Sequence, residues 1–421
     1  MADNVGRLDG LERGLPGRYR VMDCIRRNDA ISRVEIADRS GLGRSTVTSL
    51  TKSLLDDGWI RETEGISNEP ARGRPRVMLE MNADAANVLG VKLSLHQMSV
   101  AVTDFKGDVV HTTALPFNGH QPPDLAADLI EVGVRRCLNE AGLSAAGVLG
   151  LCVALPGYVS HEDGRCYWSP AFDRDNVDFG ALLAGRFDFD TSIENDANMV
   201  TLAEHWFGEG RNLSSFAVVT VEHGIGMGLI TNDRLYRGGA GIGPEFGHSK
   251  AVFGGRPCRC GQLGCVEAYA SEYAIVREVL PRFSLEGYVT DPRTYHAEIE
   301  RITREALAGN EKLRAEFEAA GRTLGQALGN LVATINPPTI IVTGEGLRAG
   351  TMMFEPMIDE IHKLALPGNP FETEVILHEW GDDVWARGAA AMVLSQAYSA
   401  APERIADQAR RSSEISQRRR A

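Results

Sequence analysis

The sequence predicts an α/β body of two lobes, preceded by a small domain of three helices and a β-hairpin. Three observations predict this fold. Apolar residues recur at helical spacing in the first 60 residues, and after about residue 85 short β-rich runs alternate with helical stretches. The chain has 421 residues, 43% of them hydrophobic and 24% charged, which suits two or three globular domains with a sizeable core.

The first two helices are predicted from spacing and capping. Residues 17–28 place apolar side chains at positions that share one helical face, namely Tyr19, Val21, Met22 and Ile25. Residues 32–42 begin with Ser32, which has Glu35 three positions later, so we expect a capping box at this end. Gly41 then breaks the second helix.

A third helix and a hairpin complete the N-terminal part. Residues 43–60 carry an apolar stripe and end near Gly58, and residues 59–65 and 74–82 are alternating runs joined by a polar loop. Three helices with a tight glycine-containing turn before the third, followed by a hairpin, make the layout of a winged helix-turn-helix. We assign residues 1–82 to such a domain.

Polar residues cover the side of the third helix that faces away from its apolar stripe. Short hydroxyls and cations suit base edges and phosphates in a major groove, and the predicted DNA-binding residues are Arg44, Ser45, Thr46, Thr48, Ser49 and Lys52. The "RGRPR" stretch is narrow and cationic enough for a minor groove and adds Arg72, Arg74 and Arg76. The alternatives are a solvated helix face and a flexible charged linker, but the two patterns together favour DNA binding.

The charge is distributed unevenly along the chain. The net charge of −13 by itself argues against a nucleic-acid binder, yet residues 1–82 hold 14 Lys+Arg against 13 Asp+Glu, a net of +1 that leaves −14 on the remainder. A small, slightly basic DNA-binding domain attached to a large acidic domain fits these numbers. Residues 401–421 are polar and basic at their end, and we expect a disordered, solvated tail in preference to one that touches DNA.

The body, residues 83–400, alternates strands with helices. Strands ending in glycine-containing turns are expected at 148–157, 216–230 and 339–347, and helices at 124–141, 197–207 and 312–334. The order of strand, turn, strand and helix recurs, which predicts two related halves around a cleft.

Cellular location is predicted from hydropathy and cysteine use. No apolar run approaches the roughly 18 residues of a membrane-spanning helix, and the N-terminus is polar and mixed in charge. The seven cysteines are an odd number and most are scattered, which indicates reduced thiols. We therefore expect a cytoplasmic protein with no membrane partner.

Three cysteines lie close together, with a histidine upstream of them. One imidazole and three thiolates form a closed tetrahedral set typical of structural zinc, and the candidate ligands are His248, Cys258, Cys260 and Cys265. Such an ion would pin the loop that carries His248 against a helix beginning near Glu267, and we call residues 245–267 the zinc loop. The alternative is a group of buried or redox-active thiols.

Two stretches resemble a known family. "GPEFGHSKAVFGGRPCRCGQLGCVEAYAS" (243–271) resembles the signature of the ROK family of repressors, open reading frames and kinases, and "IENDANMVTLAEHWFG" (193–208) resembles its sugar-site segment. The resemblance covers about residues 85–400, and residues 1–80 resemble the winged helix of the regulator branch, to which xylose and N-acetylglucosamine repressors belong. It implies an actin-like, two-lobed sugar-kinase fold, a sugar or sugar-derivative effector in the cleft, and a homodimer or dimer of dimers.

The motif matches carry five candidate sugar ligands, Asn195, Asp196, Glu245, His248 and Glu267. Asp196 stands where the family's kinases keep their general base, and carboxylates and amides are the groups that pair with sugar hydroxyls. The local alternatives are a turn or helix cap for the Asn-Asp pair and a helix cap for Glu267. Ala171 stands where the family often has an asparagine, so an unusual effector is expected.

The phosphate-binding turn of the kinases is altered in this sequence. The kinases have Asp-x-Gly-Gly-Thr after the first strand, whereas here Lys92, Ser94, Leu95 and His96 occupy the aspartate, glycine and threonine positions. The metal-organising carboxylate and the flexible backbone are both missing, so we expect no catalytic residue and regard Asp196 as a vestigial base. A second phosphate segment keeps glycines that are either ATP contacts or relics of the fold: Gly224, Gly226 and Gly228.

The leading interpretation is a sugar-responsive transcriptional regulator, most often a repressor in this branch, whose paired winged helices read the half-sites of an operator. A sugar would favour one arrangement of the lobes and so change operator affinity. The zinc loop is the predicted transmitter, because His248 belongs to both the metal set and the sugar set. Two alternatives stay open: an ATP-dependent sugar kinase with a fused DNA-binding domain, and a scaffold that uses the fold only to dimerise.

Overall fold

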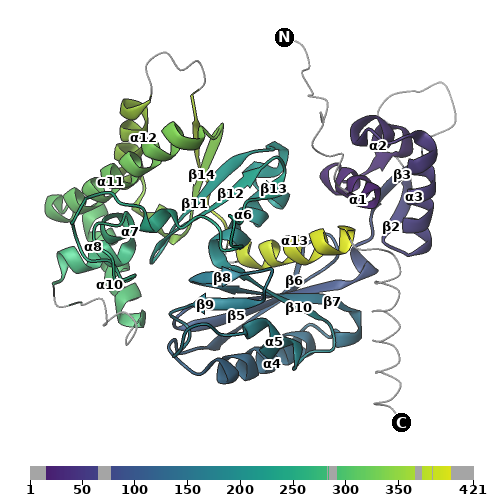
Figure 1. The fold of residues 1–421 in the computed structure, drawn as a ribbon, viewed down its shortest axis with the longest axis horizontal. Helices are drawn as coiled ribbons and strands as arrows, with labels where there is room; N and C mark the ends of the chain where they lie inside the picture. Colours follow the sequence, from purple (N-terminus) through teal and green to yellow (C-terminus); the bar gives the residue numbers. More distant parts are fainter. Residues whose placement is uncertain are drawn as a thin grey trace.

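The computed structural model describes residues 16–64, 77–281, 283, 292–365, 372–381 and 383–399. Figure 1 shows a small N-terminal domain beside two larger lobes, and each lobe is built on a five-stranded sheet. The predicted α/β body with an N-terminal winged helix is confirmed. The hook arginines Arg72, Arg74 and Arg76 and the tail at 401–421 lie outside the described residues. In the described ranges, no helix combines the length and the apolar character that crossing a bilayer requires.

The N-terminal domain has the predicted three helices, α1 (Gly17–Arg27), α2 (Arg33–Ser40) and α3 (Arg44–Asp56). The capping box is present, because the Ser32 side chain accepts from the Glu35 backbone N–H while the Glu35 carboxylate accepts from the Ser32 N–H. The hairpin strands β2 (Ile60–Glu64) and β3 (Val77–Met81) pair antiparallel. A two-residue strand that the sequence did not predict, β1 (Ile31–Ser32), pairs with β3 and makes a three-stranded sheet.

The first lobe is a sheet with strand order β10-β7-β4-β5-β6. Its strands are β4 (Asn87–Leu93), β5 (Gln97–Thr103), β6 (Val109–Pro116), β7 (Val148–Leu155) and β10 (Asp190–Asn195). The helices α4 (Pro123–Glu140) and α5 (Phe179–Ala184) belong to this lobe, as does the hairpin of β8 (Tyr158–Ser160) and β9 (Arg165–Trp168). Successive residues along a strand point to opposite faces of the sheet, so alternate residues pack toward α4. Both sets are buried, because helices cover both faces of the sheet.

The second lobe repeats this connectivity, with order β13-β12-β11-β14-β15. Its strands are β11 (Phe216–Val221), β12 (Ile225–Thr231), β13 (Arg234–Leu235), β14 (Thr339–Thr343) and β15 (Glu374–Leu377). In both sheets the first strand is central, the next two lie antiparallel on one side and the last two lie parallel on the other. The predicted relation between the two halves is therefore present in the topology.

Helices cover the far side of the second sheet. They are α7 (Glu267–Ala270), α8 (Glu272–Val279), α10 (Pro292–Leu307), α11 (Glu311–Ile335) and α12 (Thr351–Leu364), and Figure 1 shows them grouped at the left. Val219 and Val342 point into the apolar core that these helices form, whereas Val218 and Ile341 point to the opposite face. This alternation is expected of strands that are buried on both faces.

Two helices connect the lobes, α6 (Asp196–Phe207) and α13 (Val384–Ser399). A Cβ atom at Gly90 would lie 2.6 Å from the Ala389 side chain, and one at Gly388 would lie 2.0 Å from the Met199 carbonyl oxygen. Glycine at these two positions lets α13 lie directly against β4 on one side and α6 on the other. The last helix therefore returns to the first lobe, as Figure 1 shows in yellow.

Candidate functional site

A cleft of about 690 Å³ opens between the lobes. All five predicted sugar ligands line it: Asn195, Asp196, Glu245, His248 and Glu267. Aromatic side chains from both lobes also line it: Tyr158, Trp168, Phe246, Tyr295, Trp380 and Trp385. Apolar walls with a few convergent polar groups are typical of small-molecule sites.

Asn195 joins the end of β10 to the start of α6. Its side-chain oxygen accepts the backbone N–H groups of Ala197 at 2.9 Å and Asn198 at 3.3 Å, and its amide nitrogen donates to the Gly157 carbonyl at 3.0 Å. The helix-cap interpretation therefore holds for Asn195. Because its amide is engaged at both ends, its main effect is to hold the next residue, Asp196, at the mouth of the cleft.

Asp196 is half-buried at the N-terminus of α6, and its pKa lies above the ordinary value for an aspartate. Burial raises its pKa to about 6, the neighbouring Glu222 adds to the rise, and the Lys92 ammonium opposes it. Lys92 lies 3.6 Å from the Glu222 carboxylate. The charge of Glu222, followed by those of Asp196 and Glu345, raises the pKa of Lys92 despite its burial.

A buried ion pair that the sequence did not reveal supports this end of the cleft. The Glu194 side chain is fully buried, and it accepts from Arg237 Nε at 2.9 Å and from the Asn198 amide at 2.9 Å. Glu194 precedes the Asn-Asp pair on β10, so the contact fixes the strand end that presents Asp196. The sequence carried no signal for this pair, because β10 is a largely polar strand in which Glu194 does not stand out.

Glu267 is buried at the start of α7 and is held by a residue that we did not predict. Arg259 Nε lies 2.7 Å from Oε1 of Glu267 and Arg259 Nη2 lies 2.9 Å from Oε2, while the backbone N–H of Ile225 donates to Oε2 at 3.2 Å. Arg259 itself lines the cleft, and in the sequence it stands between Cys258 and Cys260. Glu245, on the other side, has a raised pKa because of burial and the Asp196 and Glu267 charges.

The predicted metal ligands come together in space. The ligand atoms of His248, Cys258, Cys260 and Cys265 all lie within 4.8 Å of one another. Cys260 and Cys265 sulfurs are 3.7 Å apart, and Cys258 sulfur is 3.7 Å from His248 Nδ1. Zinc–sulfur bonds of about 2.3 Å in a tetrahedron place sulfurs about 3.8 Å apart, so the donor set fits a closed four-coordinate ion.

The polar groups around this cluster connect it to the cleft. Tyr273 Oη donates to the Cys258 sulfur at 3.6 Å, and the Lys250 ammonium lies 3.1 Å from the Cys265 sulfur. His248 uses Nδ1 toward the cysteines and also lines the cleft. An ion here would therefore hold one wall of the cleft directly.

The predicted recognition face of α3 is open to solvent. The six residues of this face are all exposed, namely Arg44, Ser45, Thr46, Thr48, Ser49 and Lys52. The apolar positions Val47 and Leu54 of the same helix are fully buried. The Thr48 hydroxyl donates to the Arg44 carbonyl at 2.8 Å, so it has lone pairs but no free proton for a partner.

A profile described as ROK family matches residues 88–396, and one described as winged helix-turn-helix DNA-binding matches residues 18–61. The chain belongs to the ROK family. It is 27% identical over 382 residues to the xylose repressor of Caldicellulosiruptor bescii, covering 90% of this chain and 95% of that protein. It is 26% identical over 375 residues to the Escherichia coli DNA-binding transcriptional dual regulator NagC, covering 89% and 90% of the two chains.

Solved structures agree on the ROK fold. A ROK family transcriptional regulator described as a homologue of the E. coli MLC protein is 24% identical, covers 91% of this chain and 96% of its own, and has a TM-score of 0.74. A ROK family glucokinase from Streptomyces griseus, solved with glucose and AMPPNP, is 24% identical, covers 73% and 99%, and has a TM-score of 0.62.

Two departures from the ROK kinase pattern can now be located. The Lys92 turn lines the cleft, and Leu95 is almost fully buried there, so an apolar side chain fills part of the space next to the turn. Ala171 is buried in the core of the first lobe and is not among the cleft-lining residues. Its neighbours Trp168 and Pro170 line the cleft instead.

The glycines of the second phosphate segment have packing reasons of their own. A Cβ atom at Gly226 would lie 2.8 Å from the Ala197 Cβ atom, and one at Gly228 would lie 2.0 Å from the Thr201 hydroxyl; Ala197 and Thr201 both belong to α6. Both glycines are therefore required for α6 to lie against β12. Their presence is explained by the fold without any nucleotide.

Proposed function

We propose that this protein is a transcriptional repressor whose affinity for operator DNA is changed by a sugar or sugar derivative bound between its lobes. The observation that carries the proposal is that one chain holds both an exposed recognition helix and a polar, aromatic cleft. The segment between them is short, because β3 ends at Met81 and β4 begins at Asn87. The relatives named as repressors span nearly the whole chain.

The ligand class follows from the chemistry of the cleft. Asp196, Glu245 and His248 offer charged and polar groups of the kind that pair with hydroxyls, and Tyr158 and Trp168 offer flat apolar faces from the first lobe. Buried polar groups of this kind reject ligands that leave them unpaired. D-Xylose, N-acetyl-D-glucosamine and D-glucose are the first sugars to test, because they are named with the relatives.

The kinase alternative is opposed by the Lys92–Glu222 contact. A phosphoryl-transfer site needs a carboxylate free to organise Mg²⁺ and a backbone that wraps the phosphates. Here a cation stands at the first position and is tied to Glu222 at 3.6 Å. We therefore propose that Asp196 binds a sugar hydroxyl without serving as a base, and that the protein transfers no phosphate.

The metal centre and the assembly complete the proposal. We propose Zn²⁺ as the structural ion held by His248 and the three cysteines, because a closed set of three thiolates and one imidazole matches its preferences. It would fix the position of His248 and of the Glu267 helix. We also propose a homodimer, whose paired winged helices read two operator half-sites, and a cytoplasmic location.

A thermal-shift screen of zinc-loaded protein tests the function. A ligand at 100 times its dissociation constant adds about 2.7 kcal/mol of stability. We expect one of the three sugars, or its phosphate, to raise the midpoint and to change the affinity for DNA selected from a random-sequence pool, while Mg-ATP has no effect. A strong shift with Mg-ATP, together with phosphorylated sugar in the product mixture, would make the protein a kinase.

A further inference from the structure

The winged helix domain contacts both lobes beside α6 and α13, the two helices that connect them. Toward the first lobe the contact is apolar: the Trp59 and Phe105 rings meet at 5.1 Å, and Tyr398 of α13 lies 6.2 Å from Tyr19 and 6.1 Å from Phe105. The core of the winged helix is continuous with that of α6 and α13. This side of the domain is therefore packed like a protein interior.

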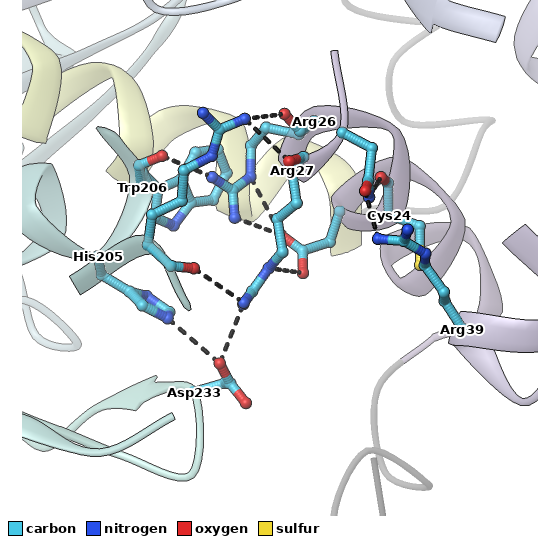
Figure 2. A network of polar contacts seen from close by, with 10 residues as sticks. Cys24, Arg26, Arg27, Arg39, His205, Trp206 and Asp233 are labelled. Atoms are coloured by element: carbon cyan, nitrogen blue, oxygen red, sulfur yellow. Dashed lines mark hydrogen bonds and ion pairs between the residues drawn. The ribbon is translucent and has the colours of Figure 1, made fainter. Parts of the chain in front are cut away.

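Toward the second lobe the contact is ionic. Arg27, the last residue of α1, donates through Nη2 to the Asp233 carboxylate at 3.0 Å and through Nη1 to the Arg211 carbonyl at 3.1 Å. Arg211 in turn donates to the carbonyls of Arg26 and Arg27 at 3.1 and 3.0 Å, which are the free carbonyls at the end of α1. Asp233 lies in the turn between β12 and β13. We call Arg27, Arg211 and Asp233 the hinge latch; Figure 2 labels Arg27 and Asp233.

The latch lies at the far end of a helix that starts in the cleft. Helix α6 begins at Asp196, and its last turn contacts the winged helix, where the Trp206 carbonyl accepts from Arg26 Nη1 at 2.9 Å. His205, on the same turn, places Nε2 3.3 Å from the Asp233 carboxylate (Figure 2). One buried helix therefore joins the candidate sugar site to the DNA-binding domain.

The latch is held in its charged form. Burial alone would raise the pKa of Asp233, but the hydrogen bond from His205 and the charge of Arg27 hold it below its ordinary value. Burial likewise favours the neutral form of Asp23. The charges of Arg26 and Arg27 outweigh this effect and hold the pKa of Asp23 at about 2. Asp23 accepts from Arg27 Nε at 2.8 Å, so the Arg27 guanidinium is oriented from within α1.

We propose that the hinge latch is the switch through which the cleft controls the DNA-binding domain. The inference rests on the proposed function, because a ligand between the lobes must favour one lobe angle. The apolar contact moves with the first lobe. The ionic contacts need donor–acceptor distances near 3 Å, so a small rotation of the second lobe makes or breaks them and changes how firmly the winged helix is held.

Two variants of the latch test this. Asp233 has φ of 59°, a backbone conformation that asparagine tolerates well, so Asp233→Asn removes the charge with little strain. Arg27→Gln removes the other partner. Arg135→Ala is the control, because Arg135 pairs with Glu131 on the exposed face of α4, in the first lobe.

The measurement is the fluorescence anisotropy of a DNA duplex selected from a random-sequence pool by the full-length, zinc-loaded protein. It is made without sugar and with saturating D-xylose, N-acetyl-D-glucosamine or D-glucose. We expect one sugar to change the DNA affinity of the wild-type protein and of Arg135→Ala by about fivefold or more. In Asp233→Asn and Arg27→Gln the change should fall below about twofold, with DNA binding itself retained, and the double variant should add nothing.

The outcomes separate the two proposals. If the wild-type protein responds to a sugar and both latch variants respond equally, the latch is wrong and the proposed function stands. If no sugar changes the DNA affinity of the wild-type protein, the proposed function fails and the latch fails with it. If one variant shows no cooperative thermal transition, it is not folded and is set aside, and the sugar response of the other variant alone decides whether the latch is the switch.

Discussion

The Arg259 guanidinium donates two hydrogen bonds, of 2.7 and 2.9 Å, to the two carboxylate oxygens of Glu267. The Glu267 side chain is only 2% exposed and that of Arg259 is 27% exposed, so the pair bridges the buried start of α7 and the open cleft. A two-pronged contact of this kind fixes direction as well as charge. Arg259 is therefore as much a part of the candidate site as the motif glutamate that it holds.

Arg259→Ala should weaken both sugar binding and folding. The substitution leaves the buried Glu267 carboxylate with the Ile225 N–H at 3.2 Å and the Cys258 sulfur at 3.7 Å as its partners. We expect this to cost about 1–3 kcal/mol of unfolding free energy, because Arg259 is partly solvated. Urea unfolding and sugar titration calorimetry measure the two effects. Arg135→Ala, on a surface ion pair, should change the unfolding free energy by less than about 1 kcal/mol. Equal losses in both variants would contradict the role given to Arg259.

Sugar affinity should rise as the pH rises through about 6. Burial raises the pKa of Asp196 to about 6, so below that pH the carboxyl group is neutral and accepts sugar hydroxyls less strongly. Without sugar the sign is opposite: the folded protein binds the Asp196 proton more tightly than the unfolded chain does, so this group lowers stability as pH rises from about 4 to 6. Calorimetry between pH 5 and 8 checks the affinity, and Asp196→Asn should abolish this step.

Lys92→Ala should move that step to higher pH. The Lys92 ammonium lowers the pKa of Asp196 more than any other cation does. Its removal leaves Arg259, with a weaker effect, as the main cation that opposes the repulsion from Glu222. The same pH titration of sugar affinity measures the shift. Lys106→Ala removes a lysine that reaches Glu80 at 3.9 Å on the surface, and its midpoint should match that of the wild type. An unchanged midpoint in Lys92→Ala would show that Lys92 does not act on Asp196.

Loss of the metal should abolish sugar binding before it abolishes folding. Cys265→Ser removes one buried ligand, so we expect bound zinc to be lost, measured by elemental analysis, and the sugar-induced thermal shift to disappear. Cys166→Ser is the control, because Cys166 is buried in the first lobe, away from the cluster, and its variant should keep the metal. Sugar binding by metal-free protein would contradict the structural role.

The recognition helix should contribute to DNA binding in two distinguishable ways. Lys52→Ala should weaken binding to all sequences and reduce the slope of log affinity against log salt by about 0.9, because one phosphate contact is lost. Ser49→Ala should change the sequence preference instead. Lys363→Ala, exposed on α12 of the second lobe, should change neither quantity. Anisotropy titrations at several salt concentrations separate these cases.

Local patterns predicted much of the molecule. The capping box at Ser32, the stop at Gly41 and the hairpin after α3 depend on residues close together in the chain, so they could be read from spacing. The metal set follows the same logic, because Cys258, Cys260 and Cys265 lie on one short loop. The sequence missed β1, whose partner strand lies more than forty residues away, since Ile31 pairs with Leu79.

The sequence by itself determined the fold class, the winged helix, the metal set and the altered phosphate turn, because each is written in neighbouring residues or in a family motif. Only the tertiary structure decided which charges meet. Arg259 with Glu267, Glu194 with Arg237 and Arg27 with Asp233 are partners separated by 8, 43 and 206 positions. Chain spacing carries no information about such pairs, since their contact depends on how the lobes and the winged helix pack around α6 and α13.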